Sequence, residues 1–158
     1  MKKLVVYYSY EGNTELIAEH IAEAAGAELQ QIVPRGEKQY RGVLKFAWGG
    51  KQILMREMPD LEPMERNPAD YDIIFLGSPV WAASYPPALR SFFAHVNLRD
   101  KRIALFCCHG GGRGGYFRKV REQLEGNTIV GEEDFVEPLT RKTRECTARA
   151  EAWARGVA

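Results

Sequence analysis

Three short, almost uninterrupted apolar runs stand out along the chain, at residues 4–8, 73–76 and 103–108. A strand that helices cover on both faces has no polar side, so runs of this kind predict the central strands of a parallel sheet. Two further segments, residues 27–33 and 128–136, mix polar with apolar residues. We expect these two segments to form strands nearer the edges of the sheet.

Between the predicted strands, apolar residues recur at the spacing of one helix face, which predicts amphipathic helices. The three groups are Leu16, Ile17, Ile21 and Ala25; Leu89, Phe92, Phe93 and Val96; and Phe117, Val120 and Leu124. A last helix is expected from about Arg141 to Trp153. The longer connection, residues 34–70, is expected to hold a helix around residues 40–50 that Gly49 and Gly50 weaken or end.

Strand and helix alternate at about 30 residues per unit, so the 158 residues accommodate five units. Right-handed crossovers place helices on both faces of a parallel sheet. The sequence therefore predicts an α/β fold that is doubly wound: a three-layer open sandwich around a five-stranded parallel sheet. We expect one domain spanning residues 1–158.

The charge balance argues against several classes of function. The 22 Lys and Arg residues against 21 Asp and Glu give a net charge of +1, so we expect no nucleic-acid or membrane partner. The apolar runs fall far short of the roughly 20 residues of a membrane-spanning helix, and no signal-peptide core follows Met1. The three cysteines, two of them adjacent (Cys107 and Cys108), cannot form a disulfide framework. We therefore expect a cytoplasmic protein.

Ligands of open parallel sheets bind where the carboxyl ends of the strands meet, and the loop at residues 9–14 follows the first strand. Its small polar side chains and Gly12 precede a helix whose free N–H groups favour an anion. Taken alone, the loop is better explained as a capped helix start with Asn13 or Thr14 as the N-cap.

Two more loops lie at the same predicted edge. Residues 77–87 combine stiff prolines with Trp81, whose flat apolar face suits a planar ring, although Trp81 and Tyr85 would also serve to plug the sheet. Residues 108–116 contain five glycines, which allow the backbone to approach a ligand closely or form a plain connection. Together the three loops predict a site for a flat ring that carries a phosphate.

Residues 7–14 (YYSYEGNT), 78–81 (SPVW) and 106–112 (FCCHGGG) give the chain a resemblance to a known family. It resembles the flavodoxin-like family over essentially its whole length. The resemblance implies the sheet order 2-1-3-4-5 and non-covalently bound flavin mononucleotide (FMN). It further implies electron transfer, with the flavin cycling between oxidised, semiquinone and hydroquinone states, and redox proteins as partners. Neither a catalytic side chain nor a metal is required.

The resemblance also implies roles for the three loops. Residues 9–14 would surround the phosphate, residues 79–82 would line one side of the isoalloxazine ring, and residues 109–112 would line its pyrimidine edge. The implied cofactor-binding residues are Ser9, Tyr10, Glu11, Gly12, Asn13, Thr14, Ser78, Pro79, Val80, Trp81, Ala82, Cys108, His109, Gly110, Gly111 and Gly112.

Two departures from the family pattern concern charge. Glu11 stands where a small hydroxyl residue is commoner, and its carboxylate repels a phosphate unless it turns outward. The chain is nearly neutral, whereas electron-carrying flavodoxins are typically acidic. Residues 78–85 and 109–116 contain no acid but include His109 and Arg113. We therefore expect the second reduction step of the flavin to be less depressed than in acidic flavodoxins, because positive charge favours the anion.

Other functions compete with electron transfer. An FMN-dependent NAD(P)H reductase of quinones would use the same loops. Five residues separate Cys107 from Arg113, the spacing of a phosphatase thiolate and arginine; however, Cys107 lies in an apolar run, which favours a buried core residue. A signalling receiver would need an aspartate near Gly77, and the chain has none there. A protein-interaction module without a cofactor is a further alternative that the sequence leaves open.

The remaining reactive side chains suggest no further chemistry. His20 and His95 lack the neighbours of a metal ligand, so we expect structural roles for both. We expect Cys146 to pack or to face solvent. The apolar residues of the long connection are expected to pack on the sheet or to form a docking or dimer contact, in a monomer or weak homodimer. These residues are Phe46, Trp48, Ile53, Leu54 and Met55.

Overall fold

The computed structural model describes residues 1–37 and 58–158. In these residues five parallel strands form one sheet in the order β2-β1-β3-β4-β5, as expected. The strands are β1 (Lys3–Tyr7), β2 (Glu28–Gln31), β3 (Ile73–Pro79), β4 (Arg102–His109) and β5 (Thr128–Val136). The helix expected around residues 40–50 and the apolar residues near it lie outside the described part.

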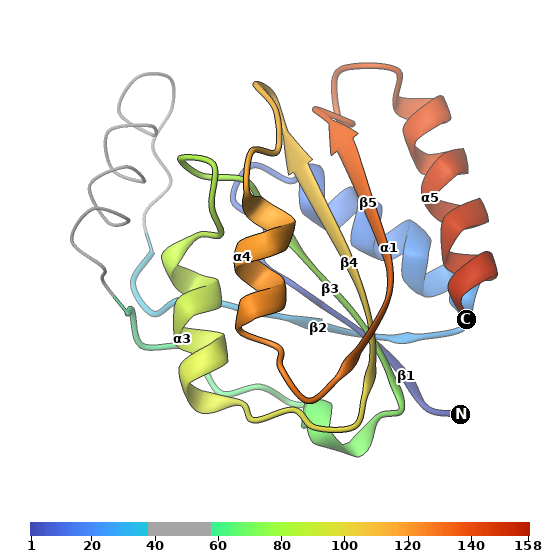
Figure 1. Cartoon of the computed structure of the whole chain (residues 1–158). Helices are drawn as coiled ribbons and strands as arrows, with labels where there is room; N and C mark the ends of the chain where they lie inside the picture. The colour runs from blue at the N-terminus through green and yellow to red at the C-terminus, as the bar shows by residue number, and fades with distance from the viewer. Residues whose placement is uncertain (38–57) are drawn as a thin grey trace.

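Helices cover both faces of the sheet (Figure 1), which confirms the doubly wound architecture. Helices α1 (Asn13–Ala25) and α5 (Thr143–Val157) lie on one face. Helices α3 (Pro87–His95) and α4 (Tyr116–Glu122) lie on the other, and a short 3-10 helix, η1 (Pro68–Asp70), precedes β3. No helix in the described residues is long and apolar enough to cross a membrane.

The continuous apolar run at the first strand explains the two cores of the molecule. Successive side chains of a strand point to opposite faces. Val5 and Tyr7 accordingly pack with Ile17 of α1, whereas Leu4 and Val6 belong to the core beneath α3 and α4. Because both faces of β1 are buried, its sequence has no polar alternation, as the prediction from the apolar run required.

Gly77 and Phe106 occupy paired positions on the central strands β3 and β4. A Cβ atom at Gly77 would lie 2.3 Å from the Phe106 ring. The glycine thus leaves room for the ring, and this packing fixes the two strands directly below the loops that follow them.

Some element boundaries differ from the sequence prediction. Strand β3 continues to Pro79, so Ser78 belongs to the strand and not to the loop. Strand β2 is shorter than residues 27–33. Helix α5 begins at Thr143 and ends at Val157, later than predicted at both ends.

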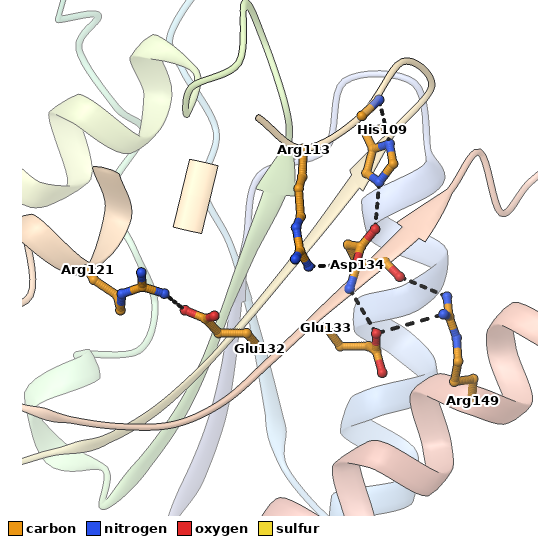
Figure 2. Close-up of polar contacts among 8 residues, drawn as sticks. His109, Arg113, Arg121, Glu132, Glu133, Asp134 and Arg149 are labelled. Atoms are coloured by element: carbon orange, nitrogen blue, oxygen red, sulfur yellow. Dashed lines mark hydrogen bonds and ion pairs between the residues drawn. The ribbon is translucent and has the colours of Figure 1, made fainter. Parts of the chain in front are cut away.

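Edge strand β5 carries three consecutive acids, residues 132–134, and each lies near an arginine (Figure 2). The first pairs with Arg121 of α4, the second lies 3.8 Å from Arg149 of α5, and the third accepts a hydrogen bond from Arg113. The partners alternate between the two faces because side chains alternate along a strand.

Candidate functional site

The carboxyl ends of β1, β3 and β4 open into one cavity of about 670 Å³, a size typical of small-molecule sites. These ends meet at the upper edge of the sheet in Figure 1. The lining residues are Ser9, Tyr10, Glu11, Asn13, Thr14, Pro79, Val80, Trp81, Ala82, Ala83, Cys108, His109, Gly110, Gly111, Gly112, Gly114 and Glu137. The structure therefore brings together all three predicted loops, and only Gly12 and Ser78 of the predicted residues are not in the lining.

The first loop turns into helix α1 at Gly12, whose φ of +106° lies in a region that favours glycine. The Ser9 hydroxyl accepts a hydrogen bond of 3.1 Å from the backbone N–H of Glu15. An α-helix has no internal acceptor for its first N–H groups, which here include those of Asn13 and Thr14. Together with the helix dipole, these amides favour an anion beside the loop.

The prediction that Asn13 or Thr14 caps helix α1 is wrong. Gly12 is the N-cap and has no side chain to cap the helix. The Asn13 side chain instead accepts a hydrogen bond of 2.9 Å from the backbone N–H of Leu139, in the turn after β5. This bond fastens the first loop to the far edge of the sheet.

The Thr14 hydroxyl is a buried polar group of the cavity lining. It interacts with the Cys108 thiol, a weak hydrogen-bond partner, and has no other in the described residues. Burial also raises the pKa of Cys108 to about 12, so the thiol is neutral. A poorly satisfied buried hydroxyl costs about 1–3 kcal/mol, which points to a polar group that the described residues do not supply.

Trp81 begins a tight turn that ends at Ser84, with reciprocal backbone hydrogen bonds of 2.9 Å. The two central residues, Ala82 and Ala83, have φ values of +50° and +59°, as in a type I′ turn. The left-handed region costs a residue with a side chain about 1–2 kcal/mol. Sequence analysis missed this turn because its usual asparagine or glycine signals are absent.

The Trp81 ring forms edge-to-face contacts with Tyr8 and Tyr10, with ring centroids 5.8 and 5.4 Å away. Such contacts orient an aromatic ring as well as bury it. Tyr8 and Tyr10 are buried, whereas Trp81 is half-buried and lines the cavity. The first two loops thus build one aromatic wall between them.

The glycine loop is fixed by His109, the last residue of β4 (Figure 2). Its Nδ1 accepts a 3.0 Å hydrogen bond from the backbone N–H of Gly112, and its Nε2 lies 2.7 Å from Asp134 Oδ2. Partial burial raises the pKa of Asp134, but the hydrogen bond from His109 and the charges of Arg113 and Arg149 outweigh it and hold the pKa below its ordinary value.

The structure adds acids beside this loop that the expectation about the second reduction step did not include. Asp134 is bonded to both residues on which that expectation rested, His109 and Arg113. Glu137 also lines the cavity, and a Cβ atom at Gly110 would lie 2.6 Å from its carboxylate. These acids come from β5 and the turn after it, whereas the sequence prediction considered only the loops after β3 and β4. The pairing of β4 with β5 would have been the signal that brings them to the site.

Ser78 supports the site from below the lining. It is buried, and its hydroxyl lies 2.7 Å from the Tyr116 hydroxyl and donates a 2.9 Å hydrogen bond to the backbone oxygen of Pro79. The Tyr116 hydroxyl is therefore the donor to Ser78. Glu11 is exposed at the cavity, as an outward-turned carboxylate would be.

The cysteine and histidine residues give no sign of hydrolytic or metal chemistry. Cys107 is buried, and burial raises the pKa of its thiol well above the usual range, which confirms the prediction of a core residue. His20 Nδ1 lies 2.7 Å from Glu151 Oε1 and links α1 to α5, as a structural histidine does. Cys146 is buried on α5. The described residues contain no group of three His, Cys, Asp or Glu side chains suited to a metal.

The fold and the cavity define a doubly wound α/β protein with its ligand site at the point where the strand order reverses. The chain belongs to the flavodoxin family, whose model matches residues 2–130. No curated protein sequence shows significant similarity.

Several solved structures share the fold. A flavoprotein from Lactobacillus acidophilus in complex with FMN has 24% identity and a TM-score of 0.71, over 84% of this chain and 92% of that one. A protein from Bacteroides uniformis classed as a flavoprotein has 21% identity and a TM-score of 0.79, over 96% of each chain. Two-electron reduced Megasphaera elsdenii flavodoxin has 22% identity and a TM-score of 0.61, over 97% and 98% of the two chains.

Proposed function

We propose that this protein binds FMN in the three-loop cavity and transfers electrons between redox proteins. The observation that carries the proposal is the convergence of a helix start rich in free amides, an aromatic wall and a glycine loop on one cavity. Family membership and the FMN bound by the Lactobacillus acidophilus relative support the same ligand.

The residues of the cavity fit a phosphorylated flavin. The amides of Asn13 and Thr14, at the start of α1, would hold the phosphate together with the buried Thr14 hydroxyl, whose only partner among the described residues is the Cys108 thiol. None of the described residues that line the cavity is lysine or arginine. Within the described part of the chain, phosphate binding would therefore rest on N–H and hydroxyl donors.

Trp81 and the glycine loop would hold the ring system. The half-buried Trp81 indole offers a flat apolar surface, kept in orientation by Tyr8 and Tyr10. Gly110 and Gly111 are exposed and have no side chain, so their backbone groups are free to approach the edge of a ring. Bound FMN supplies the electron chemistry, and the protein supplies binding, orientation and the surrounding charge.

The acids at the cavity set the electrostatics of this site. Glu11 and Glu137 both line it, and Glu137 lies 3.7 Å from the exposed Arg141, whereas Arg113 is neutralised by Asp134. Negative charge near a flavin disfavours the gain of an electron. Although the whole chain is nearly neutral, the cavity itself carries acidic side chains. We infer that redox partners dock through this local charge and not through the net charge of the protein.

A titration of the apoprotein with FMN tests the proposal. All variants carry Trp48→Phe, so that Trp81 and Trp153 are the remaining tryptophans. In this background protein fluorescence should fall saturably when Trp153→Phe is added, because Trp81 remains beside the ligand. Trp153 packs on Phe75 in the core under α5, so it serves as the matched control. The Trp81→Phe variant should lose most of the quenching. If neither a flavin spectrum in the untreated protein nor saturable binding is observed, the proposal is wrong.

Mixing the FMN-loaded protein with NADH or NADPH separates an electron carrier from a reductase. A carrier should keep its visible flavin absorption until a reductase protein is added. Rapid bleaching by the nicotinamide alone would assign the chain to the NAD(P)H-dependent reductases instead. Both outcomes leave FMN binding intact, so this test concerns only the immediate electron donor.

A further inference from the structure

His109 is held in one tautomer by its two hydrogen bonds. Its Nδ1 accepts from the Gly112 N–H at 3.0 Å, so this nitrogen carries no proton. The proton of the neutral ring is then on Nε2, which donates to Asp134 Oδ2 at 2.7 Å. A histidine whose second nitrogen is bonded to a carboxylate has both its tautomer and its ring orientation set by that carboxylate.

Asp134 is itself held in place from three directions. Its Oδ1 accepts from Arg113 at 3.1 Å, and its backbone oxygen accepts from Arg149 of α5 at 2.8 Å. Strand β5 pairs with β4, which places Asp134 opposite Cys107 in the sheet. The acceptor nitrogen of His109 is therefore aimed at the glycine loop by regular secondary structure.

The loop beside this nitrogen consists of glycine. Residues 110–112 are three exposed glycines in sequence, and Gly112 has a φ of +109°. Glycine has the largest freedom of any residue in the unfolded chain, so ordering three of them needs a specific contact. The Gly112 N–H bond to the imidazole is such a contact, and it closes a ring of four residues.

We propose that His109 is a positioning residue: its unprotonated Nδ1 holds the glycine loop in the shape that completes the cavity, and protonation of this nitrogen releases the loop and weakens FMN binding. The part that concerns FMN rests on the proposed function. On protonation, an Nδ1–H donor faces the Gly112 N–H donor, and the bond between them is lost.

The charged groups around the ring define what protonation does. Asp134 on β5 attracts the imidazolium, and Glu137 in the turn after β5 adds negative charge near Gly110. The positive charges of Arg113 and Arg149 disfavour protonation of the imidazole, and Glu133 lies 3.8 Å from Arg149. The imidazolium thus keeps its bond to Asp134 while it loses its bond to Gly112. Acidification therefore releases the glycine loop and leaves the imidazole ring in place.

Nuclear magnetic resonance of the apoprotein tests the positioning role without FMN. The ring ¹⁵N signals of His109 should show a bare Nδ1 and a protonated Nε2 near neutral pH. The amide signal of Gly112 should follow the protonation of His109 as the pH is lowered. In His109→Asn, the side-chain oxygen takes the place of Nδ1 as acceptor but does not titrate, so the Gly112 signal should stay constant. A proton on Nδ1, or a Gly112 signal that ignores His109, overturns the proposal.

FMN affinity at two pH values tests the link to binding. Histidine titrates between about pH 5 and 8, so the dissociation constant is measured near both limits for the wild type and His109→Asn. The FMN phosphate also titrates near pH 6, but this effect is common to both proteins. The wild type should lose about tenfold more affinity than His109→Asn on acidification, the equivalent of one hydrogen bond.

His109→Leu completes the series, because it removes the acceptor at every pH and should bind FMN weakly at both. Equal pH dependence in the wild type and His109→Asn overturns the link to binding. If the wild type fails to bind FMN at the higher pH, the proposed function is wrong, and the apoprotein spectra still decide whether His109 positions the loop.

Discussion

The hydroxyl groups of Ser78 and Tyr116 lie 2.7 Å apart in the core and join the end of β3 to the first residue of α4. The cavity-lining loop after β3 begins at the first of these elements, and the cavity-lining loop after β4 ends at the second. Removing one partner of such a buried pair destabilises the fold by more than the intact bond contributes, because the other polar group is left buried without a partner.

Ser78→Ala should therefore destabilise the protein more than Tyr116→Phe. Ser78→Ala removes the bonds of the serine hydroxyl to both the buried Tyr116 hydroxyl and the Pro79 oxygen and should lower the free energy of unfolding by about 1–3 kcal/mol. Tyr116→Phe leaves the Ser78 bond to Pro79 in place and should cost about 1 kcal/mol. Denaturation by urea measures both, and the reverse ranking would show that the bond has little weight.

Gly77→Ala should destabilise the sheet by about 1–3 kcal/mol or more, because the new methyl group overlaps the Phe106 ring. The matched control is Gly156→Ala in α5, where a Cβ atom meets nothing within 4 Å. That change should stabilise the helix by up to about 1 kcal/mol. Thermal unfolding of the two variants gives the comparison, and equal melting temperatures would contradict the packing argument.

Ala82→Gly should stabilise the protein by about 1 kcal/mol, because glycine adopts the φ of +50° at this position without strain. The greater freedom of glycine in the unfolded chain reduces this gain. Ala88→Gly serves as the control, since Ala88 lies in helix α3 and its replacement should destabilise by about the same amount. Both free energies of unfolding are measured in the same denaturant; a loss of stability in Ala82→Gly would argue against strain in the turn.

Three buried tyrosines should make the protein sensitive to alkali. Burial raises the pKa of Tyr7 to about 12, and burial likewise raises the pKa values of Tyr8 and Tyr116. Below about pH 10, the ordinary tyrosine value, both the folded and the unfolded chain keep these protons. Above it only the unfolded chain releases them, so each tyrosine lowers the free energy of unfolding by about 1.4 kcal/mol per pH unit.

The check is the ultraviolet absorption of phenolate recorded beside circular dichroism while the pH is raised. The three tyrosines should ionise only as the fold is lost, and Tyr7→Phe should reduce the steepness of the decline. Ionisation of all tyrosines in a folded protein would contradict this prediction.

Glu137→Gln should raise the reduction potential of bound FMN, because it removes a negative charge from the cavity lining. Glu122→Gln on α4 is the control, since its partner is Arg118 and it is not among the lining residues. It should leave the potential unchanged. A redox titration of the three loaded proteins provides the measurement; equal potentials for the wild type and Glu137→Gln would exclude Glu137 from the electrostatics of the site.

The sequence predicted the central part of the fold because burial there leaves a direct trace. The apolar runs of β1, β3 and β4 have no polar face, and their buried positions alternate between two cores. The sheet order was implied by the resemblance carried by the three loops. The loops converge because all strands of a parallel sheet have their carboxyl ends at the same edge. The positions of the strands in the sequence are therefore enough to predict this convergence.

The missed features depend on contacts between distant residues. Asp134 and Glu137 join the site only through the pairing of β4 with β5, which no local pattern in either strand specifies. Ala82 and Ala83 have positive φ values, which alanine disfavours, so residue propensities do not predict this turn. Asn13 bonds to Leu139, 126 positions away, and not to its own helix.

The alternating acids of β5 also affect how copies of this chain meet. Strand β5 is the last in the sheet, and its outer backbone groups have no neighbouring strand in the described residues. Such margins are where sheets of separate molecules fuse into aggregates. Two copies aligned along β5 would have to pack these carboxylate–arginine pairs against each other, and the cost of removing the paired charges from water helps to keep concentrated protein dispersed.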